Sequence, residues 1–530
     1  MNEQPNDERA ALRKSVYTLL IAMGIGAILG RVLAVDEVSA SRLTPYLQRE
    51  IGPRLQEKKA RLIEQGASPE RIEQELAKTR GELMRRAGIL RPFLSANDRS
   101  RWCTLRALVE RDMWAAAEVQ TADGKRQLRW VPYAINKVLA EPGWDTIDMV
   151  KHPLPSHGPR GEGFLYSSKP PLLPTLMAVP YWILYKATGA TLGTHPFAMG
   201  RTLLVIYNVV PLLIYFLLMA RLIERFGRSD WGRMFVTAAA VFGTFLTTFS
   251  VTINNHLPGA VCALIALYAA VRIWFDDERR LRYFFTAGLF ATLLVACELP
   301  GLAFTAALGA ALLWKAPKET LVAGVPAALL VAVGFFGTNW IAHETLKPAY
   351  TQTEWYDYEY QRHPDDKPVD SYWRDRQGVD RGEPSEFVYA FHALVGHHGI
   401  ISLTPVWILA AVGLVMWLVA PGDPRVRQMA IMIAAVTCAC LYFYLFMQPQ
   451  ENRNYGGMTA GLRWAFWFAP LWLVTMLPAA DHCAGKKWLR GLALVLLAVS
   501  VLSASYPTWN PWTHPWLYNF MQSMGWLGTA

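Results

Sequence analysis

Apolar segments of membrane-spanning length recur along this whole chain. They fall at residues 15–35, 171–189, 201–220, 234–250, 257–274, 283–298, 301–314, 320–341, 399–419, 427–447, 461–478 and 488–505. A helix needs about 20 predominantly apolar residues to cross the hydrocarbon core of a bilayer. We therefore predict an all-α polytopic membrane protein with about 11–13 transmembrane segments.

The composition supports this class and excludes several others. Hydrophobic residues make up 53% of the 530 residues and charged residues 18%, which is too apolar for an ordinary soluble domain. The net charge of +10 agrees with basic cytoplasmic loops beside anionic membrane lipid, and no basic patch indicates nucleic-acid binding. The cysteines have neither metal-ligand nor disulfide spacing, and Cys438 and Cys440 lie inside an apolar segment as small core residues.

Basic residues predict the orientation of a multi-pass protein of the cell (inner) membrane. Residues 1–14 are polar and basic and precede the apolar run 15–35, so the N-terminus is predicted to be cytoplasmic. A cleaved signal peptide is the alternative, because residues 38–40 could form a small-residue cleavage site. The later basic loops place these segments outside: 251–256, 342–398, 448–460 and 506–530.

The predicted topology leaves one ambiguity. Two extracytoplasmic loops must be separated by an even number of crossings, yet seven apolar segments lie between 36–170 and 342–398. One segment must therefore be re-entrant, merged or too short to cross. The two alternatives are 171–189, which contains prolines, and the pair 283–314, which is broken by Pro300 and its neighbours.

The predicted parts of the chain follow from these segments. They are a cytoplasmic N-terminus (1–14), a first transmembrane helix (15–35), a long extracytoplasmic first loop (36–170), a multi-helix transmembrane module (171–341), a second extracytoplasmic loop (342–398), the C-terminal transmembrane helices (399–505) and an aromatic extracytoplasmic tail (506–530). Within the first loop, the charged stretch 53–87 predicts a surface helical hairpin. Residues 98–112 place Trp102, Leu105 and Leu108 on one face, which predicts an amphipathic helix on the membrane surface.

The first loop contains two charged motifs, one at Asp98 and one at Lys169, close to its end. Asp98 begins the predicted amphipathic helix and is followed by two arginines, one of them Arg101. An acidic residue there is either a helix cap or a chemically active group at the membrane edge. Lys169 precedes two prolines at the start of an apolar segment, where it either snorkels to the interface or holds a lipid phosphate.

Other ionisable residues are candidates for a substrate cavity. Asp145 and Asp148 are followed by a lysine and a histidine, a spacing that suits a metal but is also typical of a polar strand or loop. His256 and Glu298 lie close to the ends of apolar segments. Ionisable groups at membrane depth are costly and usually face a cavity, whereas a solvated loop is the alternative.

Two later segments carry glycines and cations at the start of apolar helices. Residues 452–464 contain Tyr455, several glycines and Arg463, and the glycines allow close backbone approach and positive φ. Arg463 lies one turn into the helix, where it either snorkels outward or faces an anion. Residues 397–405 open another helix on the same side. Together they predict a shared extracytoplasmic cavity.

These residues together resemble the GT-C superfamily of membrane glycosyltransferases, which includes protein O-mannosyltransferases and lipid A aminoarabinose transferases. The resemblance rests on Asp98 before a helix in the first outer loop and on the Lys-Pro-Pro at 169–171. The stretch 455–463, Tyr-Gly-Gly-Met-Thr-Ala-Gly-Leu-Arg, is similar to a Gly-Gly-x-x-x-Gly-Pro-Arg stretch of many prokaryotic members, and 399–405 is similar to a helix start. The resemblance covers about residues 97–478.

The resemblance implies a GT-C-like helical bundle that transfers a hexose or pentose from a polyprenyl-phosphate donor on the extracytoplasmic face. The acceptor would be a lipid, a glycan or a protein. Asp98 matches the position of the catalytic acid of the family, and Lys169 matches the lysine that contacts the donor phosphate. The family allows a divalent metal ion, and no other cofactor is implied.

The chain departs from the family pattern at three places. Arg99 stands where many members have a second acidic residue, so that metal ligand is missing. Leu462 stands where proline is usual, and the insertion 53–87 is atypical. These departures bear on metal use and substrate class more than on the fold.

The predicted mechanism is a direct, inverting attack on the anomeric carbon. Lys169, with Arg101 or Arg463, offsets the negative charge of the departing phosphate, and Asp98 removes a proton from the acceptor. A transporter or flippase of a lipid-linked or anionic solute is a second class, although we find no internal repeat typical of many transporters. A third is a non-catalytic membrane scaffold that uses 53–87 as a partner site.

Overall fold

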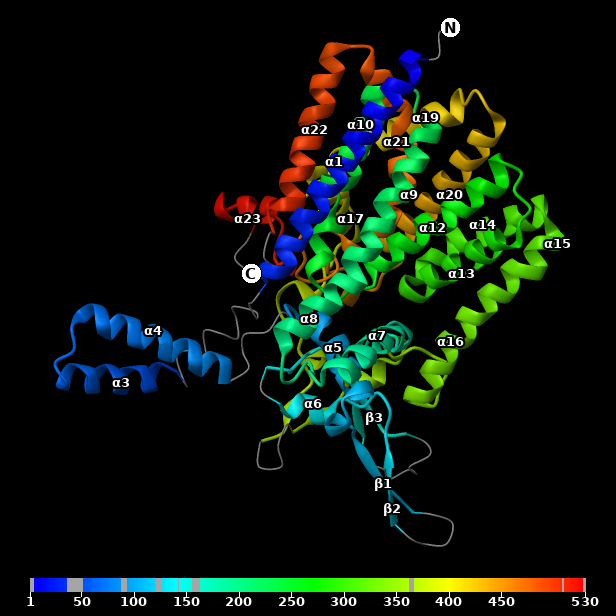
Figure 1. Ribbon diagram of the computed structural model, residues 1–530. Helices are drawn as coiled ribbons and strands as arrows, with labels where there is room; N and C mark the ends of the chain where they lie inside the picture. The colour runs from blue at the N-terminus through cyan, green and yellow to red at the C-terminus, as the bar shows by residue number, and fades with distance from the viewer. Residues whose placement is uncertain are drawn as a thin grey trace. The chain divides into compact units, whose positions relative to one another are not determined.

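The computed structural model describes residues 4–35, 51–86, 93–120, 126–141, 143–154, 163–361, 367–507 and 510–527. The described chain is mostly helical, with short two-stranded antiparallel sheets (Figure 1). It divides into two compact units, which we describe separately. The bundle unit comprises Met1–Leu33, Leu204–Phe336 and Arg376–Ala530, and the loop unit comprises Ala34–Leu203 and Gly337–Asp375.

The described residues contain seven helices that are long and apolar enough to cross a membrane. They span Glu8–Ala34, Pro196–Phe226, Asp230–Val251, His256–Phe275, Pro317–His343, Pro424–Phe446 and Lys487–Ser505. Three shorter apolar helices span Leu281–Cys297, Leu299–Lys315 and Trp407–Val419. The predicted all-helical polytopic architecture is therefore confirmed, although several of the predicted segments are shorter than a full membrane span.

The predicted segment 171–189 forms α7 (Leu172–Thr188), which belongs to the loop unit and contains Pro180. Its 17 residues rise about 25 Å, less than the roughly 30 Å of a hydrocarbon core. This helix is in neither set of apolar helices. Helix α13 (Leu281–Cys297) also has 17 residues, so helix length leaves both 171–189 and 283–314 as alternatives for the segment that does not cross the membrane by itself.

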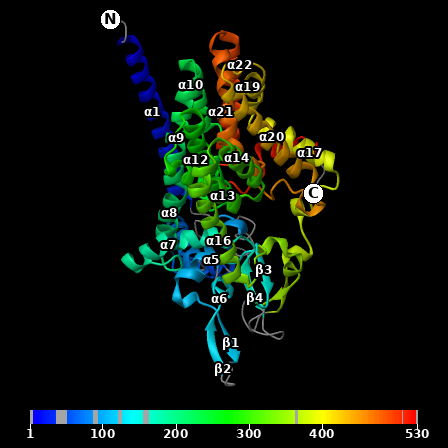
Figure 2. The same ribbon diagram turned by 90° about the vertical axis from the view of Figure 1, so that its right-hand side faces the viewer.

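The centre of the bundle unit is α12 (His256–Phe275), which is buried along most of its length. Helices α9, α10, α12, α21 and α22 run roughly alongside one another in both views (Figures 1 and 2). The bounds of the other helices of this unit are α1 (Gln4–Ala34), α9 (Val210–Phe226), α10 (Asp230–Phe242), α13 (Leu281–Cys297), α14 (Leu302–Lys315), α17 (Glu386–Leu394), α19 (Trp407–Val419), α20 (Pro424–Phe446), α21 (Ala469–Ala484), α22 (Lys487–Ser505) and α23 (Trp516–Ser523). Helix α16 (Val325–His343) begins in this unit and ends in the loop unit.

The first helix is tied to the bundle by side-chain contacts. Arg13 forms ion pairs with Glu224 at 3.1 Å and with Asp230 at 2.7 Å. The hydroxyl of Tyr17 donates a hydrogen bond to the Glu224 carboxylate at 2.6 Å. These contacts pack α1 against the bundle, and its retention as an uncleaved first helix stays a prediction. They also bring the N-terminus and residues 221–233, both predicted to be cytoplasmic, to the same end of the unit.

The loop unit contains the remaining elements. They are α3 (Gly52–Glu64), α4 (Pro69–Arg86), α5 (Ala96–Val109), α6 (Asn136–Ala140), α7, α8 (Pro196–Leu204), the antiparallel pairs β1 (Ala116–Gln120) with β2 (Arg126–Trp130), β3 (Met149–His152) with β4 (Phe164–Ser167), and β5 (Glu359–Tyr360) with β6 (Val369–Asp370). Helices α3 and α4 pack together through an ion pair between Lys58 and Glu75 at 3.0 Å. No residue of α3 is buried, so the predicted charged hairpin has the solvated surface expected of it.

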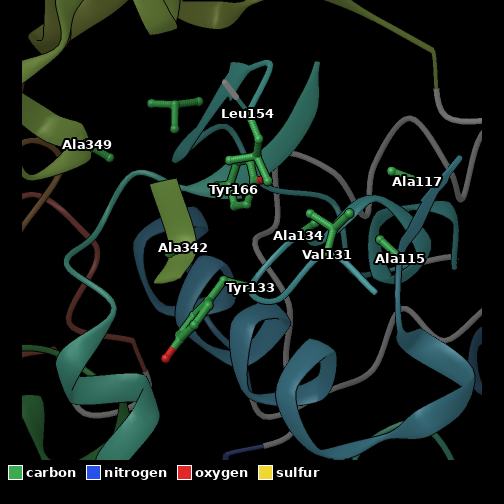
Figure 3. Close-up of a cluster of buried hydrophobic side chains, with 10 residues drawn as sticks. Ala115, Ala117, Val131, Tyr133, Ala134, Leu154, Tyr166, Ala342 and Ala349 are labelled. Carbon is green, nitrogen blue, oxygen red and sulfur yellow. The ribbon is translucent and has the colours of Figure 1, made fainter. Parts of the chain in front are cut away.

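The core of the loop unit gathers residues from its strands and from the end of α16. Small side chains, among them Ala134 and Ala342, pack around the ring of Tyr166 (Figure 3). Tyr133 lies at the edge of this cluster, and its hydroxyl is 2.8 Å from the hydroxyl of Thr175 on α7. The cluster therefore links the β3–β4 hairpin to α7 and to the 337–375 segment.

Helix α5 is buried in the loop unit, so the prediction of an amphipathic helix on the membrane surface is wrong. Nearly all its side chains are buried, including three arginines. Arg99 donates to the carbonyls of Asp145 at 2.8 Å and Phe93 at 3.0 Å, and Arg106 pairs with Glu110 at 2.7 Å. Buried cations are tolerated when they are paired or hydrogen-bonded. The arginines that suggested a polar face are thus satisfied inside the protein.

Candidate functional site

Arg463 is the centre of a buried polar network in the bundle unit. It begins the 3-10 turn Arg463–Phe468, directly before α21. Its Nη1 donates to Nε2 of His256 at 2.9 Å, and its Nε donates to the carbonyl of Gly456 at 2.7 Å. The guanidinium carbon lies 5.0 Å from the ring centroid of Trp512. Two acceptors and an aromatic face therefore fix the plane of the cation.

Glu298 completes this network from the break between α13 and α14. It follows Cys297, the last residue of α13, and precedes the 3-10 turn Leu299–Gly301. Its Oε1 contacts Nδ1 of His256 and accepts a hydrogen bond from Nδ2 of Asn255 at 2.7 Å. The side chains of His256 and Glu298 are only 2% and 6% exposed. The structure therefore brings together three residues predicted separately, Arg463, His256 and Glu298.

The glycine loop before Arg463 has the backbone that its sequence predicts. Tyr455, Gly456 and Gly457 have φ values of 58°, 90° and 83°. A Cβ atom on Gly456 would lie 3.1 Å from Nε of Arg463, which is tighter than an ordinary contact. The Asn454 side chain accepts from the Gly456 amide at 3.1 Å and holds the turn. Glycine is thus needed at 456 for both its conformation and its closeness to the cation.

A small, mostly apolar pocket adjoins the turn that carries Arg463. Leu462 and Phe466 line it from this turn, and Phe245, Trp407 and Trp472 line it from neighbouring segments. Its volume is about 30 Å³, roughly enough for one methyl-sized branch and too little for a whole prenyl chain. The segment that carries Arg463 therefore also lines a small apolar pocket, while the Arg463 side chain itself contacts Gly456, His256 and Trp512.

Three histidines, His392, His397 and His398, contact the ring of the fourth predicted residue of this unit, Tyr455, and a fourth, His514, contacts His398. The ring of His398 stacks on Tyr455 with centroids 4.8 Å apart, and Nδ1 of His397 lies 2.5 Å from Nδ1 of His398. His392 stacks on His397 at 3.9 Å, and His514 lies 6.0 Å from His398. Burial lowers the pKa of His397 to about 3 and also lowers the pKa values of the other three imidazoles. These rings are neutral at pH 7 and support Tyr455 by packing.

In the loop unit, Lys169 forms an ion pair with Asp148. The distance from Nζ to Oδ1 is 3.0 Å, and the two side chains are 22% and 11% exposed. Asp148 directly precedes β3, and Lys169 lies just after β4, where its amide donates to Ser167 Oγ at 3.2 Å. The β3–β4 pairing therefore brings these two predicted residues together. Phosphate binding by Lys169 would have to compete with this carboxylate.

Asp98 lies in the first turn of α5 and is fully buried, with 0% exposure. Ser95 is the N-cap, and its hydroxyl accepts from the Asp98 amide at 3.2 Å. The Asp98 carboxylate accepts from the Leu94 amide at 3.0 Å and from Nε1 of Trp102 at 2.9 Å. The carboxylate thus reinforces a cap that Ser95 supplies, whereas the sequence suggested Asp98 itself as the cap. Its role as catalytic base stays a prediction.

Arg101 and Asp145 are also built into the loop unit. Nη1 of Arg101 donates to the side-chain oxygen of Asn97 at 2.5 Å and to its carbonyl at 2.9 Å. The backbone carbonyl of Asp145 accepts from Nε of Arg99 at 2.8 Å. The Asp145 carbonyl therefore helps to hold α5 in place, whereas the Arg101 contacts lie within α5 itself, and the predicted ligand roles of both residues stay predictions.

Sequence reasoning missed two members of the Arg463 network. Trp512 falls in the tail predicted as an interfacial belt, yet its ring supports the guanidinium. Asn255 orients Glu298 and has no signal beyond its position before a helix. Within the described part of the chain, no group of three or more His, Cys, Asp or Glu residues is placed to hold a metal ion.

Comparison with known proteins finds distant structural similarity alone. No protein-family profile and no curated protein sequence matches the chain. A crystal structure of the Archaeoglobus fulgidus oligosaccharyltransferase with Zn and sulfate is similar at 16% identity and a TM-score of 0.40, covering 70% of this chain and 48% of that one. The archaeal oligosaccharyltransferase AglB of the same organism, with an inhibitory peptide and a dolichol-phosphate, is similar at 15% identity and a TM-score of 0.36, covering 66% and 48%. The chain spans about half the length of the solved chains that it matches.

Proposed function

We propose that this chain is a GT-C-type membrane glycosyltransferase, which moves a sugar from a polyprenyl-phosphate donor to an acceptor. The observation that carries the proposal is the fixed guanidinium of Arg463, which stands at the start of a turn that also lines a small apolar pocket through Leu462 and Phe466. A lipid phosphate needs both features, because the planar fork of arginine suits phosphate oxygens and the pocket suits a branch of the apolar chain. The order of the sequence motifs supports sugar transfer as the reaction.

Two sets of contacts in the bundle unit support an extracytoplasmic site, in a protein of the cell (inner) membrane with a cytoplasmic N-terminus. His256 is the last residue of the predicted outer segment 251–256, and Arg463 follows the predicted outer segment 448–460. Their hydrogen bond is what two loops on one side of the membrane would form. The ion pairs of Arg13 agree with a common, opposite side for residues 1–14 and 221–233.

In the proposed reaction, the bond between the anomeric carbon of the sugar and the phosphate oxygen breaks. Negative charge grows on the departing phosphate, and a preorganised cation such as Arg463 offsets it. The acceptor hydroxyl or amine forms the new bond from the opposite face, which inverts the anomeric carbon, and gives its proton to a base. Asp98 as base, and Lys169 and Arg101 as phosphate ligands, remain the sequence-based assignments within this proposal.

The test uses the full-length protein in nanodiscs with a panel of polyprenyl-phosphate sugars and acceptors, and it measures release of polyprenyl phosphate. Wild type should turn over at least one donor, and Arg463→Gln should lose on the order of a hundredfold or more of the rate. Arg427→Gln is the matched control, because Arg427 is exposed in the first turn of α20 and donates to the carbonyl of Val419. Asp98→Asn tests the base: normal turnover by this variant would end that assignment.

Failure of every donor, with the fold intact, would overturn the proposal. A transporter or flippase would then be tested by movement of a labelled polyprenyl phosphate across vesicles that contain the protein. Loss of partner binding on deletion of 53–87, with no reaction detected, would instead favour a scaffold.

A further inference from the structure

The network around Arg463 has a defined direction of hydrogen bonding. Arginine can only donate, so Nε2 of His256 accepts from Nη1 of Arg463. The neutral imidazole therefore carries its proton on Nδ1, the nitrogen that faces Oε1 of Glu298. Asn255 donates to the same carboxylate oxygen and to the carbonyl of Cys297 at 3.0 Å. Glu298 thus selects the histidine tautomer that can accept from Arg463.

Burying these ionisable side chains costs free energy, and a contact that served only to hold the helices together would not need them. The side chains of His256 and Glu298 are almost fully buried, and Arg463 stands on a third segment of the chain. Well-packed apolar side chains hold helices together at least as well as buried ionisable groups, which lose their hydration. Charged and polar residues at this position have a further effect, because they fix the orientation of the Arg463 guanidinium.

We infer that Glu298 and His256 are positioning residues that hold the Arg463 guanidinium in one orientation for the phosphate of an apolar phosphate ester. The inference rests on the proposed function, because it takes Arg463 as the phosphate ligand. Paired hydrogen bonds between guanidinium and phosphate require a defined plane. Preorganisation of that plane strengthens the phosphate contact and leaves the contacts of the apolar chain unchanged.

The effect on the phosphate can be separated from the effect on the chain with two probes. Farnesyl phosphate and farnesol share one apolar chain and differ in the phosphate. Their dissociation constants are measured by tryptophan fluorescence on full-length protein in nanodiscs, and the ratio of the two constants reports the phosphate contact. The variants are Glu298→Gln, His256→Phe and Arg463→Gln. Glu451→Gln is the matched control, because Glu451 is exposed in the same outer segment 448–460.

Wild type should prefer farnesyl phosphate, and Arg463→Gln should lose this preference. Glu298→Gln and His256→Phe should each reduce the ratio about tenfold, the usual effect of one lost hydrogen bond to a charged group. Farnesol affinity should stay at the wild-type value in both, while thermal stability falls because a buried partner is lost. His256→Gln should restore most of the preference, because an amide oxygen can accept from Arg463 in place of the imidazole.

Three other outcomes would overturn the positioning role, the effect on the phosphate contact or the phosphate site itself. Loss of preference in Arg463→Gln alone, with Glu298→Gln and His256→Phe like wild type, would refute the positioning role and leave the proposed function standing. Parallel loss of affinity for both probes, with lower thermal stability, would show a structural tie only. Absence of any preference in wild type would refute the phosphate site itself, and the proposed function with it.

Discussion

Acidification should loosen the β3–β4 hairpin of the loop unit, because a neutral histidine is packed in its core. The ring of His152 stacks on Trp355 at 3.7 Å and on Tyr166 at 4.7 Å between centroids. Its Nδ1 lies 3.1 Å from the carbonyl of Pro153, and its Nε2 lies 3.0 Å from Nδ1 of His343. A carbonyl can only accept, so Nδ1 of His152 carries the proton and Nε2 accepts from His343. A second proton on Nε2 would break this hydrogen bond.

The size of the effect follows from the pKa of His152. Burial lowers this pKa to about 4, whereas an exposed histidine titrates near pH 6.5. The pKa of His152 is lower in the closed hairpin than in the open one. The neutral imidazole therefore stabilises the closed hairpin fully above about pH 6.5, and this stabilisation is lost as the pH falls toward about 4. Between pH 7.5 and pH 5.0 the free energy of opening should fall by about 2 kcal/mol, which is roughly a thirtyfold larger open population.

Hydrogen exchange followed by mass spectrometry on the full-length protein in nanodiscs measures this opening. After correction for intrinsic rates, peptides from β3 and β4 should lose about thirtyfold in protection at pH 5.0, and peptides from α10 should not. The variant His152→Phe keeps a stacking ring but binds no proton. Its hairpin should be weaker at pH 7.5 by about 1–2 kcal/mol and almost independent of pH. Unchanged wild-type protection, or an equal pH dependence in the variant, would refute the reasoning.

Two further predictions concern packing and capping. Gly413→Ala should destabilise the α19–α21 contact by about 1–3 kcal/mol, because its Cβ would lie 2.0 Å from the carbonyl oxygen of Thr475. The midpoint temperature of thermal inactivation should be lower for Gly413→Ala than for the control Gly309→Ala, whose Cβ would meet nothing within 4 Å. Equal midpoint temperatures for the two variants would contradict the prediction. Ser95→Ala should cost about 1 kcal/mol at the start of α5, seen as faster exchange in its first turn. Ser95→Asp should restore the cap, and similar exchange in both variants would show that the cap contributes little.

The helical architecture could be predicted because long apolar segments and helix starts carry their own signals. The charged hairpin is an example, since Ser68 and Pro69 predict the start of α4, and the Ser68 hydroxyl accepts from the Arg71 amide at 3.4 Å. The burial of α5 could not be predicted in this way. Its Arg106 pairs with Glu110 on the next turn but also with Glu141 from another element, and no local pattern shows the second partner.

The candidate site was predictable as a set of residues but not as a set of contacts. His256 and Arg463 are 207 positions apart, and each has an adequate local explanation as a residue at a helix end. The structure gives two of the predicted cations, Lys169 and Arg463, different surroundings. Lys169 is paired directly with the carboxylate of Asp148, so a phosphate would displace an existing anion there. Arg463 instead donates to a carbonyl and an imidazole, and the Glu298 carboxylate acts through that imidazole. A phosphate at Arg463 can keep this support in place, and the support therefore favours Arg463 as a phosphate ligand.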